Sequence, residues 1–390
     1  MAPKMPSPGV YREERFVTSL PVLPTGVPGF VGLGESAGGA AVGLQRPEEF
    51  AARFTPPADG PGYLEAAVAG FFVNGGKRCY VVGAAASGDD TARAAALVTA
   101  LAALAPLRDL DLVAAPDAMA LDRDAREQVQ RALVAHCVEQ GDRFALLDAP
   151  PGLDPARTDL GASFAQWRQR LGSAGHENAA CYYPWVRISP SGTSPTGMVP
   201  PSGHVAGIIT RADGRVGVHK APANEIVEGI LDLEYPIDAE AQGLLGPLGI
   251  NCLRVLPGRG LRLYGARTLS QDPEWRYVNV RRVVLTLGRW IDRNLAWAAF
   301  EPNGPRLWVR IRRELEVHLN GLRQSGALQG TTPAEAFFVK CDAETNPAEG
   351  RELGQVVTEI GLAPAVPAEF VVVRITHRAA GAEIGAVTES

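Results

Sequence analysis

Asp117 and Asp148 are the residues whose type and position come closest to a catalytic site. Each follows a predicted strand, at residues 110–114 and 144–147, within a β-α-β-α-β pattern. Ligands of open α/β sheets bind at the carboxyl ends of parallel strands, so the two carboxylates could hold Mg²⁺ or act as acid and base. A magnesium-dependent α/β-fold enzyme using Asp117 and Asp148 is therefore one hypothesis for the function.

The neighbourhood of these two aspartates favours a structural role instead. No lysine, serine or histidine constellation accompanies them, and both stand beside prolines, Pro116 and Pro150-Pro151, as is typical of turns. The glycines from Gly32 to Gly38 have GxGxxxG rather than GxGxxG spacing, and neither a P-loop nor an HExxH motif occurs. We expect no catalytic residue, no metal site and no cofactor.

Composition limits the classes of protein to which the chain could belong. It has 390 residues with a formal net charge of −5, which is too mild to indicate a nucleic-acid-binding protein. Its five cysteines are far apart and lack metal-ligand spacing, which is typical of small buried side chains in a reducing compartment. The first residues lack the apolar core of a signal peptide, and no stretch is long and apolar enough to insert in a membrane. These features predict a protein made in the cytoplasm.

Strand and helix patterns alternate from residue 27 to residue 183 and predict an α/β fold class, mixed α+β over the whole chain. We expect an extended arm at 1–25, an α/β domain at 26–248, a C-terminal α+β domain at 249–378 and a second arm at 379–390. The first arm is rich in proline and yet carries β-prone residues. A segment of this kind could add a strand to another chain's sheet. Its candidate residues are Pro8, Gly9, Val10, Tyr11, Phe16 and Val17.

An arginine-rich stretch marks the C-terminal half. Residues 276–323 include ten arginines, four acidic residues and no lysine. The stretch could be a solvated helix face with internal ion pairs or a contact surface for an acidic protein. Nucleic acid is less favoured because the tryptophans here fall at core-like helical positions. On the predicted helix at 306–322, Arg306, Arg310 and Arg313 share one stripe, beside an apolar stripe of Leu307, Ile311, Leu315, Leu319 and Leu322.

Several short runs resemble the tail sheath proteins of contractile phage tails, R-type pyocins and contractile injection systems. They include Pro200-Pro-Ser-Gly-His-Val-Ala-Gly207, Lys220-Ala-Pro-Ala-Asn224, Pro257-Gly-Arg-Gly260, Trp275-Arg-Tyr-Val-Asn-Val-Arg-Arg282 and Ala334-Glu-Ala-Phe-Phe-Val-Lys340. Ser7-Pro-Gly-Val-Tyr11 and Phe71-Phe-Val-Asn-Gly-Gly-Lys-Arg-Cys-Tyr80 also look like sheath. The resemblance covers nearly the whole chain and is thinnest between residues 84 and 175.

This resemblance implies a compact tail-sheath fold and a structural subunit that performs no chemical step. The subunit would polymerise as stacked hexameric rings around an inner tube, with its own copies and any sheath paralogues, and contract to drive the tube through a target envelope. Its other partners would be baseplate and terminal cap proteins, within a phage tail or tail-like particle. The sheet receiving the neighbours' arms would include Phe337, Phe338, Val339, Phe370, Val371, Val372 and Val373. A C-terminal helix would contact the tube, with Arg306, Arg310 and Arg313 as candidates and a predicted helix at 350–362 as the next choice.

Overall fold

The structure, a computed structural model, describes residues 23–57, 62–86, 88–190, 197–369, 373–378 and 381–386. Its helices are α1 (Glu49–Arg53), α2 (Leu64–Val73), α3 (Asp90–Ala100), α4 (Arg123–Gln140), α5 (Leu160–Arg170), α6 (Ser202–Arg215), α7 (Ala239–Leu245), α8 (Val278–Asn294), α9 (Pro305–Gln324), α10 (Pro333–Ala336) and α11 (Ala348–Glu352). Its strands are β1 (Pro28–Leu33), β2 (Glu35–Ser36), β3 (Val42–Leu44), β4 (Phe54–Thr55), β5 (Cys79–Ala84), β6 (Leu112–Ala114), β7 (Phe144–Asp148), β8 (Ala179–Tyr183), β9 (Val186–Arg187), β10 (Met198–Val199), β11 (Glu225–Ile226), β12 (Asp232–Leu233), β13 (Ile250–Leu256), β14 (Gly260–Tyr264), β15 (Phe337–Lys340), β16 (Glu359–Leu362), β17 (Val373–Arg378) and β18 (Gly381–Ala386).

Nine strands form the main sheet, in the order β11-β14-β13-β8-β7-β6-β1-β5-β3. The six strands from β13 to β5 run parallel, while β14, β11 and β3 pair antiparallel at the two sides. Strands β1, β6, β7 and β8 are buried at every position, as expected for parallel strands covered on both faces. This confirms the predicted α/β fold class.

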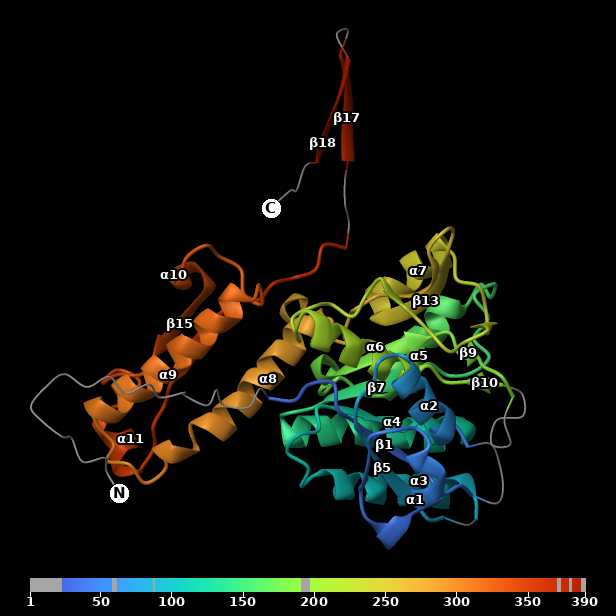
Figure 1. Ribbon diagram of the computed structural model, residues 1–390, viewed down its shortest axis with the longest axis horizontal. Helices are drawn as coiled ribbons and strands as arrows, with labels where there is room; N and C mark the ends of the chain where they lie inside the picture. Colours follow the sequence, from blue (N-terminus) through green and yellow to red (C-terminus); the bar gives the residue numbers. More distant parts are fainter. Residues whose placement is uncertain are drawn as a thin grey trace, which may run out of the picture.

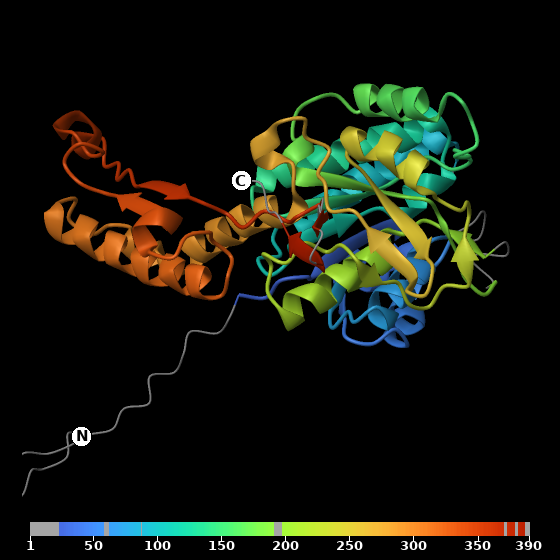
Figure 2. The same cartoon turned by 90° about the horizontal axis from the view of Figure 1, so that it is seen from above.

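Helices cover both faces of this sheet (Figures 1 and 2). Alternate residues of β1 enter two different hydrophobic clusters, Val31 the first and Phe30 the second. The first cluster includes residues of α3, α4, α5 and α7, and the second includes residues of α2, α6 and α8. We call the sheet with these helices the sheet body.

Helices α2 and α6 cross very closely because α6 carries glycines at the crossing. A Cβ atom at Gly203 would lie 2.3 Å from the Cα of Ala67, and one at Gly207 would lie 2.3 Å from the carbonyl oxygen of Phe71. The four-residue spacing puts both glycines on one face of α6. This packing accounts for the Gly-His-Val-Ala-Gly run at 203–207.

Helix α8 joins the sheet body to a smaller body made of α9, α10, α11, β15 and β16 (Figure 1). Val278 and Leu285 of α8 are buried in the sheet body, whereas Trp290 and Ile291 pack against the core of the smaller body. That core has five buried residues: Leu307, Trp308, Ile311, Leu315 and Cys341. We call this part the C-terminal body.

The predicted domain boundary near residue 248 needs correction. Strand β13 pairs parallel with β8 and antiparallel with β14, so the main sheet continues through residue 264. The prediction failed because the pattern of residues 249–264 indicates strands but does not indicate which sheet those strands join. The two bodies meet instead along α8.

One prediction about the C-terminal residues is also wrong. The helix expected at 350–362 is only α11, which Gly354, with φ +71°, follows. The β-prone residues after it lead into β16, which pairs with β15. Residues 381–386, within the arm expected at 379–390, pair with β17 in an antiparallel hairpin, from Val373 opposite Ala386 to Arg378 opposite Gly381.

Candidate functional site

Asp117 binds backbone amides at the start of a helix. This residue follows β6 in the chain and is fully buried. Its Oδ1 accepts hydrogen bonds from the amides of Tyr63 (2.5 Å) and Leu64 (2.9 Å) at the start of α2. Its Oδ2 accepts one from the amide of Leu33 (2.7 Å). Burial raises the pKa of Asp117 to about 6, and the three amides oppose that shift. Both oxygens are thus occupied by the main chain.

Asp148 has the same role for α6. It is the last residue of β7, is 3% exposed, and its Oδ1 accepts from the amide of Ser202 at 2.8 Å. Burial raises the pKa of Asp148 to about 7. The two aspartates therefore hold the starts of the two helices that cross closely. In the described parts of the chain, no three or more His, Cys, Asp or Glu side chains gather in a way that could hold a metal.

Gly34-Glu-Ser-Ala-Gly38 has the GxSxG spacing of a serine nucleophile, a match that the sequence interpretation missed. Ser36 lies in β2, is 6% exposed, and its hydroxyl donates to the carbonyl oxygen of Ala40 at 2.8 Å. A nucleophile elbow instead places the serine between a strand and a long helix, hydrogen-bonded to a histidine. Here a three-residue 3-10 helix, Ala37–Gly39, follows, so the segment is a turn.

The three candidate arginines of α9 have different surroundings. Arg310 stacks on Trp297, with its guanidinium carbon 3.5 Å from the ring centroid, and pairs with Glu314 at 3.4 Å. Arg306 and Arg313 are exposed, and neither forms an ion pair within the described residues. Within the apolar stripe of α9, Leu307, Ile311, Leu315 and Leu319 are buried and Leu322 is half-buried. Arg306 and Arg313 are therefore the members of the stripe that remain available to a partner.

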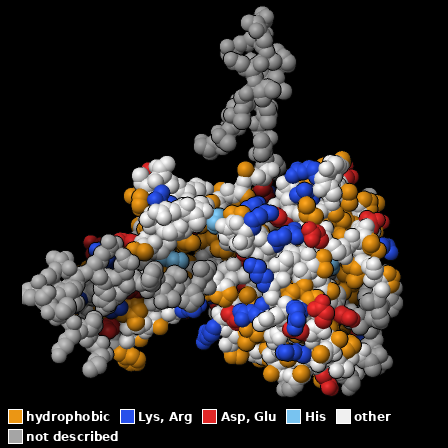
Figure 3. Space-filling view, in the orientation of Figure 1, with side chains coloured by type: hydrophobic (Ala, Val, Ile, Leu, Met, Phe, Trp, Pro, Cys, Tyr) orange, Lys and Arg blue, Asp and Glu red, His pale blue; other side chains and the backbone are white. Residues whose placement is uncertain are grey.

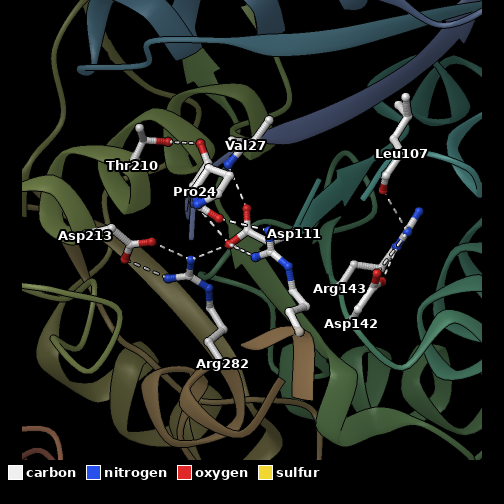
Figure 4. Close-up of polar contacts among 11 residues, drawn as sticks. Pro24, Val27, Leu107, Asp111, Asp142, Arg143, Thr210, Asp213 and Arg282 are labelled. Carbon is white, nitrogen blue, oxygen red and sulfur yellow. Dashed lines mark hydrogen bonds and ion pairs between the residues drawn. The ribbon is translucent and has the colours of Figure 1, made fainter. Parts of the chain in front are cut away.

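Other arginines of the basic stretch are internal (Figure 4). Arg282 of α8 is 2% exposed and donates to Asp213 at 2.9 and 2.6 Å and to Asp111 at 3.0 Å. Nearby, Arg289 is 5% exposed. Sequence reasoning missed this cluster because its members lie in three distant segments that no local pattern connects. Some of the arginines that outnumber the acids in this stretch thus neutralise buried carboxylates.

Strands β15 and β16 form a sheet of only two strands, from Phe337 opposite Leu362 to Lys340 opposite Glu359. No further strand among the described residues pairs with either edge. Phe338 is 58% exposed, while Val339 and Ile360 contact the core of the C-terminal body. Two-stranded sheets are at best marginally stable alone. The open edges and the exposed phenylalanine make this sheet the strongest candidate for an assembly site.

Some predicted site residues cannot be placed. Pro8, Gly9, Val10, Tyr11, Phe16 and Val17, together with Phe370, Val371 and Val372, lie outside the described residues. Val373 lies in β17 and pairs with Ala386, not with β15. Charged and apolar side chains intermingle over the visible face of the sheet body, without a broad patch of one sign (Figure 3).

The described helices include none with the length and apolar character needed to cross a lipid bilayer. Curated relatives include a prophage major tail sheath protein of Pseudomonas aeruginosa (strain UCBPP-PA14), which is 24% identical over 239 residues. That alignment covers 58% of this chain and about half, 55%, of the relative.

Solved structures match over nearly the full length. One comes from the six-fold symmetrised baseplate of the anti-feeding prophage (29% identity, TM-score 0.76, 95% of this chain and 99% of that chain). Another comes from the contracted sheath complex of PVC, an extracellular contractile injection system (28% identity, TM-score 0.75, 96% and 98%).

Two family profiles together cover most of the chain. The phage tail sheath protein central domain matches residues 79–269, and the phage tail sheath C-terminal domain matches residues 270–378. The family is structural rather than enzymatic, in agreement with two aspartates whose role is to hold helix starts. The chain belongs to the phage tail sheath protein family.

Proposed function

We propose that this chain is the sheath subunit of a contractile injection machine, which polymerises as stacked hexameric rings around an inner tube and contracts to drive the tube through a target envelope. The observation that carries the proposal is the match to the baseplate chain of the anti-feeding prophage, over 95% of this chain and 99% of that one. The six-fold symmetry of that baseplate and the contracted state of the PVC sheath support rings and contraction here.

Subunits join by strand addition at the β15–β16 sheet. An open edge offers a row of unpaired main-chain donors and acceptors, and an incoming strand satisfies them. The residues that receive it are Phe337, Phe338 and Val339 of β15. The donors are the two chain ends, with Pro8 to Val17 at the amino end. Because such a joint holds subunits through donated strands rather than through a rigid interface, neighbouring rings can rotate and approach one another while remaining joined.

The exposed face of α9 contacts the inner tube. Arg306, Val309, Arg313 and Val317 recur at spacings of three and four residues and lie on one side of the helix. Val309 is 52% exposed and Val317 is 69% exposed, so the arginines flank apolar surface. Arg310, the third candidate, is also exposed, but its guanidinium stacks on Trp297 and pairs with Glu314. Complementary charge at such a contact sets register and docking rate more than affinity.

The remaining partners follow from the same proposal. The subunit binds further copies of itself and any sheath paralogues, the baseplate at one end and a terminal cap at the other. It requires no cofactor and no nucleic acid, and it does not insert in a membrane. Assembly takes place in the cytoplasm before the particle is complete.

Electron microscopy of the purified, full-length chain expressed with its tube protein tests the proposal. We expect tubes whose end-on views show six-fold symmetry, in a long and a short form. Discrete small particles under all conditions would refute the proposal.

A further inference from the structure

The chain enters the sheet body through residues 24–27, which we call the amino-terminal root. The Oδ1 of Asp111 accepts from the amide of Val27 at 2.7 Å, and its Oδ2 accepts from the amide of Gly26 at 3.0 Å. The hydroxyl of Thr210 on α6 donates to the carbonyl oxygen of Gly26 at 2.6 Å. Gly26 has φ +69°, and a Cβ there would lie 2.7 Å from the Cα of Thr210. The root is therefore pressed against α6 and held on both sides.

Helix α8 holds the same root through two buried arginines. Arg289 Nη2 donates to the carbonyl oxygen of Pro24 at 2.9 Å. Arg282 joins Asp111, which binds the root, to Asp213 on α6 (Figure 4). All four charged side chains are at most 9% exposed. Salt screens such buried pairs much less than it screens surface pairs.

The other chain end is held by contacts on and beside the same helix. We call residues 363–369 the carboxy-terminal root. Asn279 of α8 donates through its Nδ2 to the carbonyl oxygen of Ala365 at 3.0 Å and to that of His219 at 2.9 Å. Glu369 accepts from Arg267 Nε at 2.8 Å, shortly before α8 begins. This root is thus tied to the start of α8.

Asn279, Arg282 and Arg289 are separated by three and seven residues, so they lie on one face of α8. We propose that this face links the two roots, so that a pull on one chain end passes through α8 to the other end and bypasses the main sheet. The strand next to the amino-terminal root is β1, which lies between β5 and β6 inside the sheet. Without the link, a pull on the amino end would act directly on β1.

The purpose of the link rests on the proposed function, in which both ends are attached to neighbours, but its test does not. Pulling on single full-length subunits through handles at the two chain ends involves no assembly step. Arg289→Met and Thr210→Val loosen the amino-terminal root, and Arg267→Met loosens the carboxy-terminal root. Arg281→Met is the matched control, because Arg281 lies on α8 but bonds Asn178 and stacks on Trp275.

We expect all three root variants to unfold the sheet body, identified by the length released, at lower force than the parent. The control should unfold at the parental force. Thr210→Val is nearly isosteric, so it carries the test if Arg289→Met does not fold.

Equal forces in the parent and the amino-terminal root variants would overturn the link. A shift confined to those variants, with Arg267→Met unchanged, would also overturn it, because the carboxy-terminal root would then carry no part of the force. Absence of tubes in the microscope together with the expected forces would reject the proposed function and leave this inference standing.

Discussion

At the scale of single residues, position in the fold decides what a carboxylate does. Asp117 and Asp148 stand at the carboxyl ends of parallel strands, where α/β enzymes place their catalytic acids. In this chain the starts of α2 and α6 occupy the same place, and their amides take the carboxylate oxygens. The position that suggests chemistry is used to dock two helices.

The two aspartates should differ in their tolerance of amide substitution. Asp117 uses both oxygens, so Asp117→Asn places an NH₂ group against a buried main-chain amide. We expect a loss of about 1–3 kcal/mol in the free energy of unfolding. Asp148 accepts a main-chain hydrogen bond through one oxygen only, from Ser202, so Asp148→Asn should cost about 1 kcal/mol or less. Urea unfolding of each variant measures the difference, and equal losses would contradict this account.

Asp148 should also make stability depend on pH. Its folded-state pKa, raised by burial to about 7, means that the folded chain holds the proton more tightly than the unfolded chain. The stabilisation from the protonated form is full below the unfolded pKa of 3.8 and is lost as pH rises through about 7. We expect the melting temperature to fall from pH 6.5 to 8 in the parent and to fall less in Asp148→Asn.

The choice of this pH range separates Asp148 from buried histidines. Burial lowers the pKa of His204 to about 4, so its contribution to stability changes mainly between that value and its ordinary value of 6.5. Parallel melting curves for the parent and Asp148→Asn above pH 6.5 would show that Asp148 does not titrate there.

At the scale of elements, α9 has three surfaces with different tasks. Its apolar stripe builds the core of the C-terminal body, and Arg310 and Glu314 fasten its flank to Trp297. The opposite face presents Arg306 and Arg313 to solvent. This last surface is the one that the proposed tube contact uses.

Reversing charge on the exposed face of α9 should block docking on the tube. We expect Arg306→Glu with Arg313→Glu to fold normally, because each exposed charge contributes only about 0–1 kcal/mol to the stability of the subunit. The variant should fail to polymerise on isolated tubes at low salt, because charge reversal turns attraction to the tube into repulsion. A sedimentation assay with tubes measures this.

The matched control reverses two exposed charges on the sheet body, Arg46→Glu with Arg123→Glu, whose side chains are 76% and 66% exposed. The control should assemble as the parent does. Equal assembly of the α9 variant and the parent would assign the tube contact to another segment.

At the scale of the whole molecule, the two bodies have unequal means of stabilising themselves. The sheet body buries large clusters of residues on both faces of its sheet, whereas the main core cluster of the C-terminal body has five buried residues, under one long helix and a two-stranded sheet. A small core supplies little stability. We infer that strands added by neighbours complete the C-terminal body, which ties its stability to assembly.

Removing the amino-terminal arm should separate folding from assembly. We expect a chain lacking residues 1–15 to be soluble and folded, because the anchored root at 24–27 and the whole sheet body remain. It should not polymerise, since the strand it donates is gone. Light scattering reports assembly and circular dichroism reports folding. Normal tubes from the shortened chain would place the essential joint elsewhere.

Local patterns in the sequence predicted much of this protein. Alternating apolar strands and amphipathic helices predicted the parallel sheet, because each element's periodicity records which face is buried. Helix α4, for example, has Asp122 as its N-cap and Gly141 in the left-handed region after it, as local capping residues indicate. The resemblance to sheath proteins supplied the family, which the comparisons confirm.

Only the tertiary structure decided how the distant segments meet. The sequence could not place β13 and β14 in the main sheet, since the residue pattern of a strand does not determine which strand it pairs with. It also could not tell that Arg282 is buried between Asp111 and Asp213 while Arg313 is exposed, although both lie in the same arginine-rich stretch. Charge and spacing are local properties, whereas burial and pairing depend on which segments fold together.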